Sequence, residues 1–477
     1  MGTGYFPVSY NESGFNTPEK DTAKTWFKRK LFYEHFIQVE GEDYFLAVDP
    51  LLNISAGREI LQENTALLFQ NTRGAQAVGQ IGKKVSFYSV FYENQARFAD
   101  FRSEYFRSRG ELRYNNGVYY TDNATVPGGG RTKPFKENGF DYASSAAHIR
   151  FQPIKQIELQ LGNTPQFIGW GHRSFLLSDN SFNFTNIQAQ WDISPKLRYQ
   201  VIRGKQLNLY RRAVTNQVEA PFERKNFGAH YLTFRPNEKI SISVYEATTY
   251  LRDQAFSSQS VHPLFYNPVI GINSLVAGEE IAALKNLAGL NLGWNYWDKH
   301  LLYGQIILDN FNSPEYGFQL GWRGTDIFRI KNLLIQVEYN AASERLFSAS
   351  NERLAYTHFN LPLAHTLGNG FEEFIFRASY QWKRIKLSAL SVNYRSNQPI
   401  HQKTALFQSN QAPVFNNETT VSFNSGELSY IFNESTMLAI FVKSIYRMEN
   451  PNLGENRNNG IILFGVRTGI RNQYMDF

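Results

Sequence analysis

The stretch AAHIRFQPIKQIELQL, residues 146–161, contains two alternating segments joined by a short turn. In the first segment Ile149 lies between His148 and Arg150, and in the second Glu158 lies between two aliphatic residues. A period of two is typical of a β-strand that has one wet face and one dry face. This stretch therefore predicts two neighbouring antiparallel strands.

The same alternation recurs along the chain, for example in LLIQVEYN (333–340) and FIFRASYQW (374–382). Short turns, such as 194–195, alternate along the chain with long connections, such as 97–140. A soluble sandwich does not need all its short turns at one end, whereas an outer-membrane barrel has short periplasmic turns and long extracellular loops. We therefore expect an all-β, transmembrane antiparallel β-barrel of about 18 strands.

The composition favours one large unit. No linker, charge block or change in composition divides the 477 residues. We expect residues 1–43 to form an N-terminal periplasmic or plug-like segment and residues 44–477 to form the barrel. No apolar run reaches the length of about 18 residues that a transmembrane helix needs.

Several classes of site and partner are not expected. The chain has no Cys, which excludes disulfides and thiolate ligands, and its His residues lack metal-binding spacing. We therefore predict no metal and no cofactor. The formal charge of +7 is spread along the chain rather than clustered, so nucleic acid is not expected as a partner.

The first thirty residues contain no apolar core of a signal peptide. We expect a bacterial outer-membrane protein whose signal peptide has been removed and whose apolar strand faces contact lipid.

The loop GNTPQFIGWGHRSFLLSD (162–179) fits neither a helix nor a lipid-facing strand. Its glycines permit sharp turns, and its aromatic and charged side chains suit a sugar, which stacks on rings and accepts hydrogen bonds from Arg. The alternative is a constriction loop folded against the barrel wall. Both interpretations place the loop inside the barrel and use the same residues: Phe167, Gly169, Trp170, Gly171, His172, Arg173 and Asp179.

His172 and Ser174 lie close together in this loop, but a hydrolase needs a base within reach of the nucleophile and a group that orients the base. Spacing alone does not supply that geometry, and no G-x-S-x-G elbow occurs. We therefore expect no enzymatic activity.

Charged residues on the polar strand faces are expected to line the lumen. They would form either a selectivity ladder for an anionic polymer or a wall of mutually paired charges. The predicted lining residues are His148, Arg150, Glu158, Glu338, Arg377 and Arg467.

Six stretches of the sequence resemble one known family. They are WFKRKLFYEHF (26–36), NTRGAQAVGQIGKKVSFYSVFYENQ (71–95), GWGHRSFLLSD (169–179), YNPVIG (266–271), LYGQIILDNF (302–311) and YTHFNLPLAHTLGNGFEEF (356–374). Together they are similar to the Wzi-like capsule-assembly outer-membrane barrels of Bacteroidetes, a family that includes the gliding-motility protein RemB. The similarity runs in order from about residue 26 to 395.

The resemblance implies a non-enzymatic outer-membrane barrel that engages surface polysaccharide, such as capsule or exopolysaccharide, or supports gliding-associated surface assembly. Two alternatives stay open: a structural membrane subunit that binds gliding or type 9 secretion machinery, and a substrate-selective porin. The terminal Phe477 also resembles the signal by which barrels are recognised for outer-membrane assembly.

Overall fold

The computed structural model describes most of the chain. The described residues are 25–61, 66–115, 118–211, 222–251, 262–276, 284–309, 314–349, 351–397, 399–401, 417–470 and 474–477.

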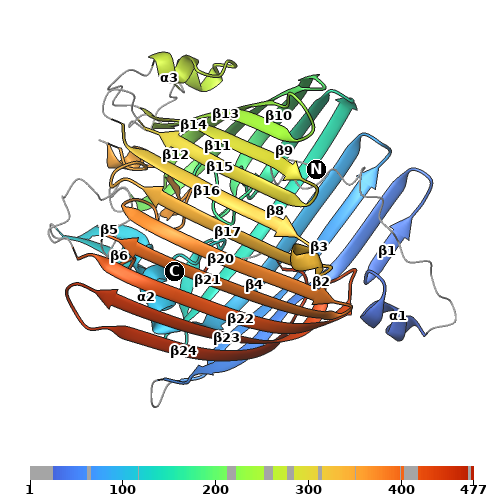
Figure 1. Ribbon diagram of the computed structural model, residues 1–477, viewed down its shortest axis with the longest axis vertical. Coiled ribbons are helices and arrows are strands. Elements are labelled where there is room, and N and C mark those ends of the chain that lie inside the picture. Colours follow the sequence, from blue (N-terminus) through green and yellow to red (C-terminus); the bar gives the residue numbers. More distant parts are fainter. Residues whose placement is uncertain are drawn as a thin grey trace.

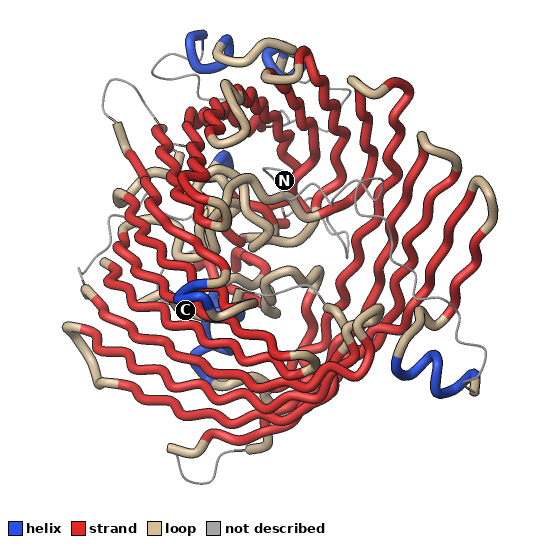
Figure 2. Tube along the Cα trace, turned by 45° about the vertical axis from the view of Figure 1, so that its right-hand side comes forward, coloured by secondary structure: helices blue, strands red, loops and turns tan. Residues whose placement is uncertain are grey.

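Eighteen antiparallel strands form a closed barrel (Figures 1 and 2). The ring closes where β2 pairs with β24, with Ile54 opposite Val466. In chain order the barrel strands are β2 (Tyr44–Glu59), β3 (Leu68–Ile81), β4 (Val85–Arg97), β8 (Gly139–Ile154), β9 (Ile157–Thr164), β10 (Phe184–Ser194), β11 (Leu197–Arg211), β12 (Phe222–Phe234), β13 (Ile240–Leu251), β14 (Leu284–Trp297), β15 (His300–Leu308), β16 (Tyr316–Thr325), β17 (Leu333–Ala342), β20 (Phe371–Trp382), β21 (Ile385–Ser396), β22 (Thr419–Asn433), β23 (Leu438–Pro451) and β24 (Arg457–Arg467). The predicted fold class is confirmed.

The two faces of each strand differ as the alternation predicts. On β8 and β9 the outward Ile149 and Leu161 are exposed, whereas His148, Arg150 and Gln160 point inward and are buried. Closure pairs the backbone groups of every barrel strand with two neighbours, which is the sheet arrangement that hydrocarbon tolerates.

The hydrophobic core lies inside the barrel. Inward-folding parts of the connections 98–138, 165–183 and 343–370, together with residues 474–477, pack inside the lumen, and we call them the plug. Most of its buried apolar residues form one cluster with inward residues of the wall such as Phe227 and Tyr245. The plug contains α2 (Asp100–Ser108), η3 (Glu352–Leu354), β18 (Thr357–His358) and β19 (Leu361–Pro362), and the connection between β4 and β8 also contains β5 (Glu111–Asn115), β6 (Val118–Asp122) and β7 (Thr132–Phe135).

One hairpin connection was not visible in the sequence. Residues 326–332 join β16 to β17 and contain η2 (Ile327–Arg329). Asp326, Phe328 and Asn332 have φ between 54° and 67°. Left-handed turn residues are usually Gly, Asn or Asp, so Phe328 is the member of this turn that the sequence does not indicate.

The N-terminal segment lies at the end of the barrel that carries the short turns. Helix α1 (Trp26–Phe32) is followed by β1 (Ile37–Glu40), which pairs with β2. The Asn433 side-chain amide donates to the carbonyls of Lys30 and Glu34, at 2.9 and 3.0 Å, so α1 is fixed to the turn after β22. Residues 1–24 lie outside the described part of the chain. Over the described ranges, no helix is both long enough and apolar enough to span a membrane.

The C-terminal residues do not extend the last strand. β24 ends at Arg467, and Phe477 is fully buried in the lumen, with its ring 4.3 Å from that of Tyr105 between centroids. Phe477 is thus part of the plug rather than the end of a lipid-facing strand, which differs from the interpretation of this residue as a terminal-strand signal.

Candidate functional site

The loop that follows β9 turns into the lumen and closes on itself. The backbone of Ile168 donates to the Leu177 carbonyl at 2.8 Å, and the Ser174 hydroxyl donates to the Ile168 carbonyl at 2.5 Å. Gly169 has φ of +145°, and a Cβ there would overlap the Gln305 amide of the wall. Only glycine combines that backbone conformation with such close approach.

Glu338 of β17 anchors the middle of this loop. Its fully buried carboxylate accepts hydrogen bonds from the backbone N–H groups of His172 (2.7 Å) and Arg173 (3.1 Å) and from the Tyr303 hydroxyl (2.8 Å). A Cβ at Gly171 would overlap this carboxylate. A buried charge needs such a full set of donors, and here the loop backbone supplies two of them.

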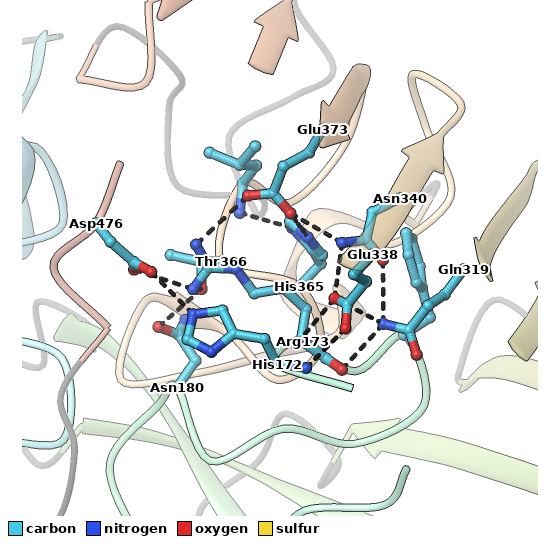
Figure 3. Close-up of polar contacts among 12 residues, drawn as sticks. His172, Arg173, Asn180, Gln319, Glu338, Asn340, His365, Thr366, Glu373 and Asp476 are labelled. Carbon is cyan, nitrogen blue, oxygen red and sulfur yellow. Dashed lines mark hydrogen bonds and ion pairs between the residues drawn. The ribbon is translucent and has the colours of Figure 1, made fainter. Parts of the chain in front are cut away.

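Arg173 lies at the centre of the plug and is only 1% exposed (Figure 3). Its guanidinium is 3.1 Å from Asp476 of the C-terminal residues and 3.4 Å from Glu373 of β20. It also donates to the Thr366 hydroxyl at 3.3 Å. One side chain therefore joins the loop, the wall and the chain end.

Two carboxylates balance this arginine. Burial opposes ionisation of Asp476, but attraction to Arg173 and hydrogen bonds from His172 and Arg173 outweigh it and hold the Asp476 pKa well below its ordinary value. Burial alone would lower the pKa of Arg173, but Asp476 and Glu373 raise it, so the guanidinium stays charged.

His365 extends the cluster as a neutral ring. Burial lowers its pKa more than Glu373 raises it. The Leu367 backbone N–H donates to Nδ1 at 3.2 Å, so the proton lies on Nε2, which is 2.7 Å from a Glu373 oxygen. The second ring nitrogen thus fixes the tautomer.

The remaining predicted loop residues are less constrained. Trp170 is half-buried and lies over Gly293 of β14, where an added Cβ would be 2.7 Å from the indole nitrogen. Phe167 and Asp179 are half-buried in the same loop. The Ser174 hydroxyl bonds to Ile168 and the His172 ring bonds to Asp476, at 2.9 Å, so these two groups do not form a nucleophile and base pair.

The predicted lining residues are placed mainly in pairs. Arg150 lies 3.0 Å from Glu158 on the next strand, and Arg467 donates to Glu427 at 3.0 Å. His148 packs beside Tyr88, with 5.8 Å between ring centroids. Arg377 is exposed on the inward face of β20.

The sequence did not indicate Asp476, Glu373, His365 or Thr366 as parts of this cluster. Glu373 does fall on the polar face of an alternating strand, which is a usable signal. Asp476 lies after the alternation ends and is about 300 residues from its partner in the chain, so no local pattern could identify it. Among the described residues no group of three or more His, Asp or Glu side chains is arranged to hold a metal ion.

Solved structures share this architecture. The chain matches Wzi of Escherichia coli, described as an outer-membrane protein involved in group 1 capsule assembly and a carbohydrate-binding β-barrel, at 13% identity and a TM-score of 0.53, over 89% of this chain and 85% of that one. The chain has the fold of an outer-membrane β-barrel. At that identity the match concerns the fold alone.

Porins of Pseudomonas aeruginosa also match, with lower scores. They include OccK2 (OpdF), solved with glucuronate, at 10% identity and a TM-score of 0.47 over 90% of this chain and 99% of that one. OprD matches at 12% identity and 0.45, over 92% and 97%. No family model matches the sequence, and no curated protein sequence does.

Proposed function

We propose that the protein is a non-enzymatic outer-membrane barrel of the Wzi-like and RemB type, which engages capsule or exopolysaccharide at the cell surface. The observation that carries this proposal is the plug: connections from the long-loop end pack inside the lumen and are fixed to the wall through Arg173, Glu338 and Glu373. A barrel of this width leaves an aqueous channel when nothing fills it. A barrel narrowed by such a plug is better suited to holding a polymer than to passing solutes.

Features of the loop support a polysaccharide as the partner. Trp170 directly precedes the loop segment that Glu338 holds by the backbone of His172 and Arg173, and its half-buried indole lies against Gly293 of the wall, so the loop backbone beside it is fixed before any ligand arrives. Ring faces of sugars stack on such aromatic platforms, and a fixed platform loses little entropy on binding.

The test is binding of the purified barrel, in detergent or vesicles, to the capsule or exopolysaccharide of its own organism. We expect Trp170→Ala to weaken binding by about 1 to 3 kcal/mol, the scale of one aromatic platform. Trp294→Ala is the matched control, because that indole is half exposed on the outer face of β14. Failure of the unmodified barrel to bind any native glycan would refute the proposal, and stoichiometric protein partners in a gentle detergent extract would favour a role as a structural subunit.

A further inference from the structure

A short segment between β13 and β14 folds over the outside of the barrel. Residues 262–276 contain η1 (Pro263–Tyr266) and α3 (Ile272–Val276), and we call them the strap. Tyr245 and Ala247 of β13 belong to the lumen core, so the intervening Glu246 faces outward, and it is Glu246 that bonds to the strap. Figure 1 shows α3 outside the wall beside β13 and β14.

The wall under the strap is polar. Glu246 is 1% exposed and accepts hydrogen bonds from the backbone N–H groups of Gly271 (2.9 Å) and Ser274 (2.6 Å) and from the Ser274 hydroxyl (2.6 Å). Asn273 donates to the hydroxyls of Thr248 (3.3 Å) and Tyr250 (2.8 Å), which also face outward from β13. These contacts fix the second half of the strap.

The first half is fixed by β11 and β12. Arg203 donates to the carbonyls of Phe265 (2.6 Å) and Asn267 (2.5 Å) of the strap, and it also contacts His230 of β12 at 2.9 Å. The Tyr199 hydroxyl donates to the Pro268 carbonyl at 2.6 Å. The strap therefore supplies partners for Arg203 and Tyr199, and these two side chains in turn bond to His230.

This polar area lies at a height where a barrel is normally apolar. Outward residues of β13 are apolar only from Ile240 to Val244, which covers about 12 Å of height at the usual strand tilt, whereas the lipid-facing band is about 25 Å tall. On β20 the outward apolar series runs from Phe374 to Trp382, about twice as far. Uncovered charges at this depth would be costly.

The outer surface of the strap is apolar instead. Its exposed fractions are 83% for Leu275, 68% for Tyr266, 56% for Val276 and 50% for Val269. This surface continues the band formed by Val244 and Leu290 below it and restores the apolar height that β12 and β13 lack.

We infer that the strap is embedded in the outer leaflet and that lipid acyl chains are the partner of its apolar surface. The inference rests on the outer-membrane location proposed above. The outward polar cluster then serves to hold the strap, and the strap shields that cluster from hydrocarbon.

The chain has no Cys, so a single nitroxide label can be placed without other changes. Leu275→Cys in the full-length barrel, labelled and reconstituted in phosphatidylcholine vesicles, should relax severalfold faster with oxygen, which dissolves in lipid, than with a water-soluble nickel chelate. Leu290→Cys, on the lipid face of β14, should give the same ratio, and Leu453→Cys, exposed between β23 and β24, should give the reverse.

The outcomes are distinguishable. If Leu275→Cys behaves like Leu453→Cys while Leu290→Cys reports lipid, the inference is wrong and the apolar surface of the strap serves a protein partner. If Leu290→Cys is also accessible to the nickel chelate, the outer-membrane location itself fails. Val276→Cys provides a second position should labelling at Leu275 perturb folding.

Discussion

Arg173 is the residue on which the plug depends most, because it neutralises two buried carboxylates from different parts of the chain. Removing one partner of a buried ion pair leaves an uncompensated charge, which typically costs about 3 to 5 kcal/mol. We expect Arg173→Ala to lower the free energy of unfolding by that amount. Urea unfolding in detergent, followed by near-ultraviolet circular dichroism, measures the change.

Arg377→Ala is the control for Arg173→Ala. It removes the same type of side chain, but Arg377 lies on the inward face of β20 and is exposed. The free energy of unfolding should therefore hardly change. Equal losses in the two variants would mean that Arg173 contributes only its general charge and not the pairing with Asp476 and Glu373.

Asp476 should make the stability of the plug depend on pH. Because its folded-state pKa lies below its unfolded value, its ionisation stabilises the fold fully above about pH 4, the ordinary carboxyl pKa. The contribution is lost as pH falls towards the folded-state pKa. The stability difference between the unmodified protein and Asp476→Asn should therefore be constant from pH 7 to pH 5 and narrow below about pH 4. A difference that widened in acid would reverse this assignment.

Among the elements, the end of the chain and α2 stabilise each other. Phe477 packs against Tyr105 and Phe101, and its carbonyl accepts from Arg447 at 2.9 Å. Truncation of a fully buried Phe typically costs about 3 to 5 kcal/mol, so Phe477→Ala should lower the melting temperature clearly. Phe464→Ala, on the exposed outer face of β24, should lower it much less in detergent, and equal shifts would contradict docking of the chain end.

The strands were predictable because the alternation of polar and apolar residues is visible within the sequence of each strand. In the stretch 146–161 the alternation alone assigns Ile149 to the outside and Arg150 to the inside, and closure of the barrel follows when this pattern repeats. The hairpin 326–332 was not apparent, since its left-handed residues include Phe328 and no Gly.

The candidate site was predictable only in its local half. GWGHR indicated an inward loop, and the structure shows why each glycine is needed there, but the partners of Arg173 come from β20 and from the chain end. Contacts between residues so far apart in sequence depend on how the connections pack inside a closed lumen, and no periodicity encodes that packing. The strap was hidden for the same reason: Glu246 and His230 look like lumen residues until the register places them outside.

At the scale of the whole molecule, we expect the plug to determine whether the barrel conducts. The plug is joined to the wall at Glu338 and Glu373, and its C-terminal residues are joined to the loop at Arg173. Truncation after Ile470 removes Asp476 and Phe477 together, so it breaks the ion pair with Arg173 and uncovers the aromatic face of α2 while leaving every barrel strand in place. Loosened loops in a lumen of this width should admit water and ions.

We therefore expect the full-length barrel to show little conductance in planar bilayers and the truncated barrel to conduct severalfold more. Asp476→Asn, which keeps Phe477, should give an intermediate conductance. The full-length and the truncated barrel should both still migrate as folded barrels in unheated gels. High conductance from the full-length protein would instead favour the porin alternative, because the plug would then leave a solute path through the lumen.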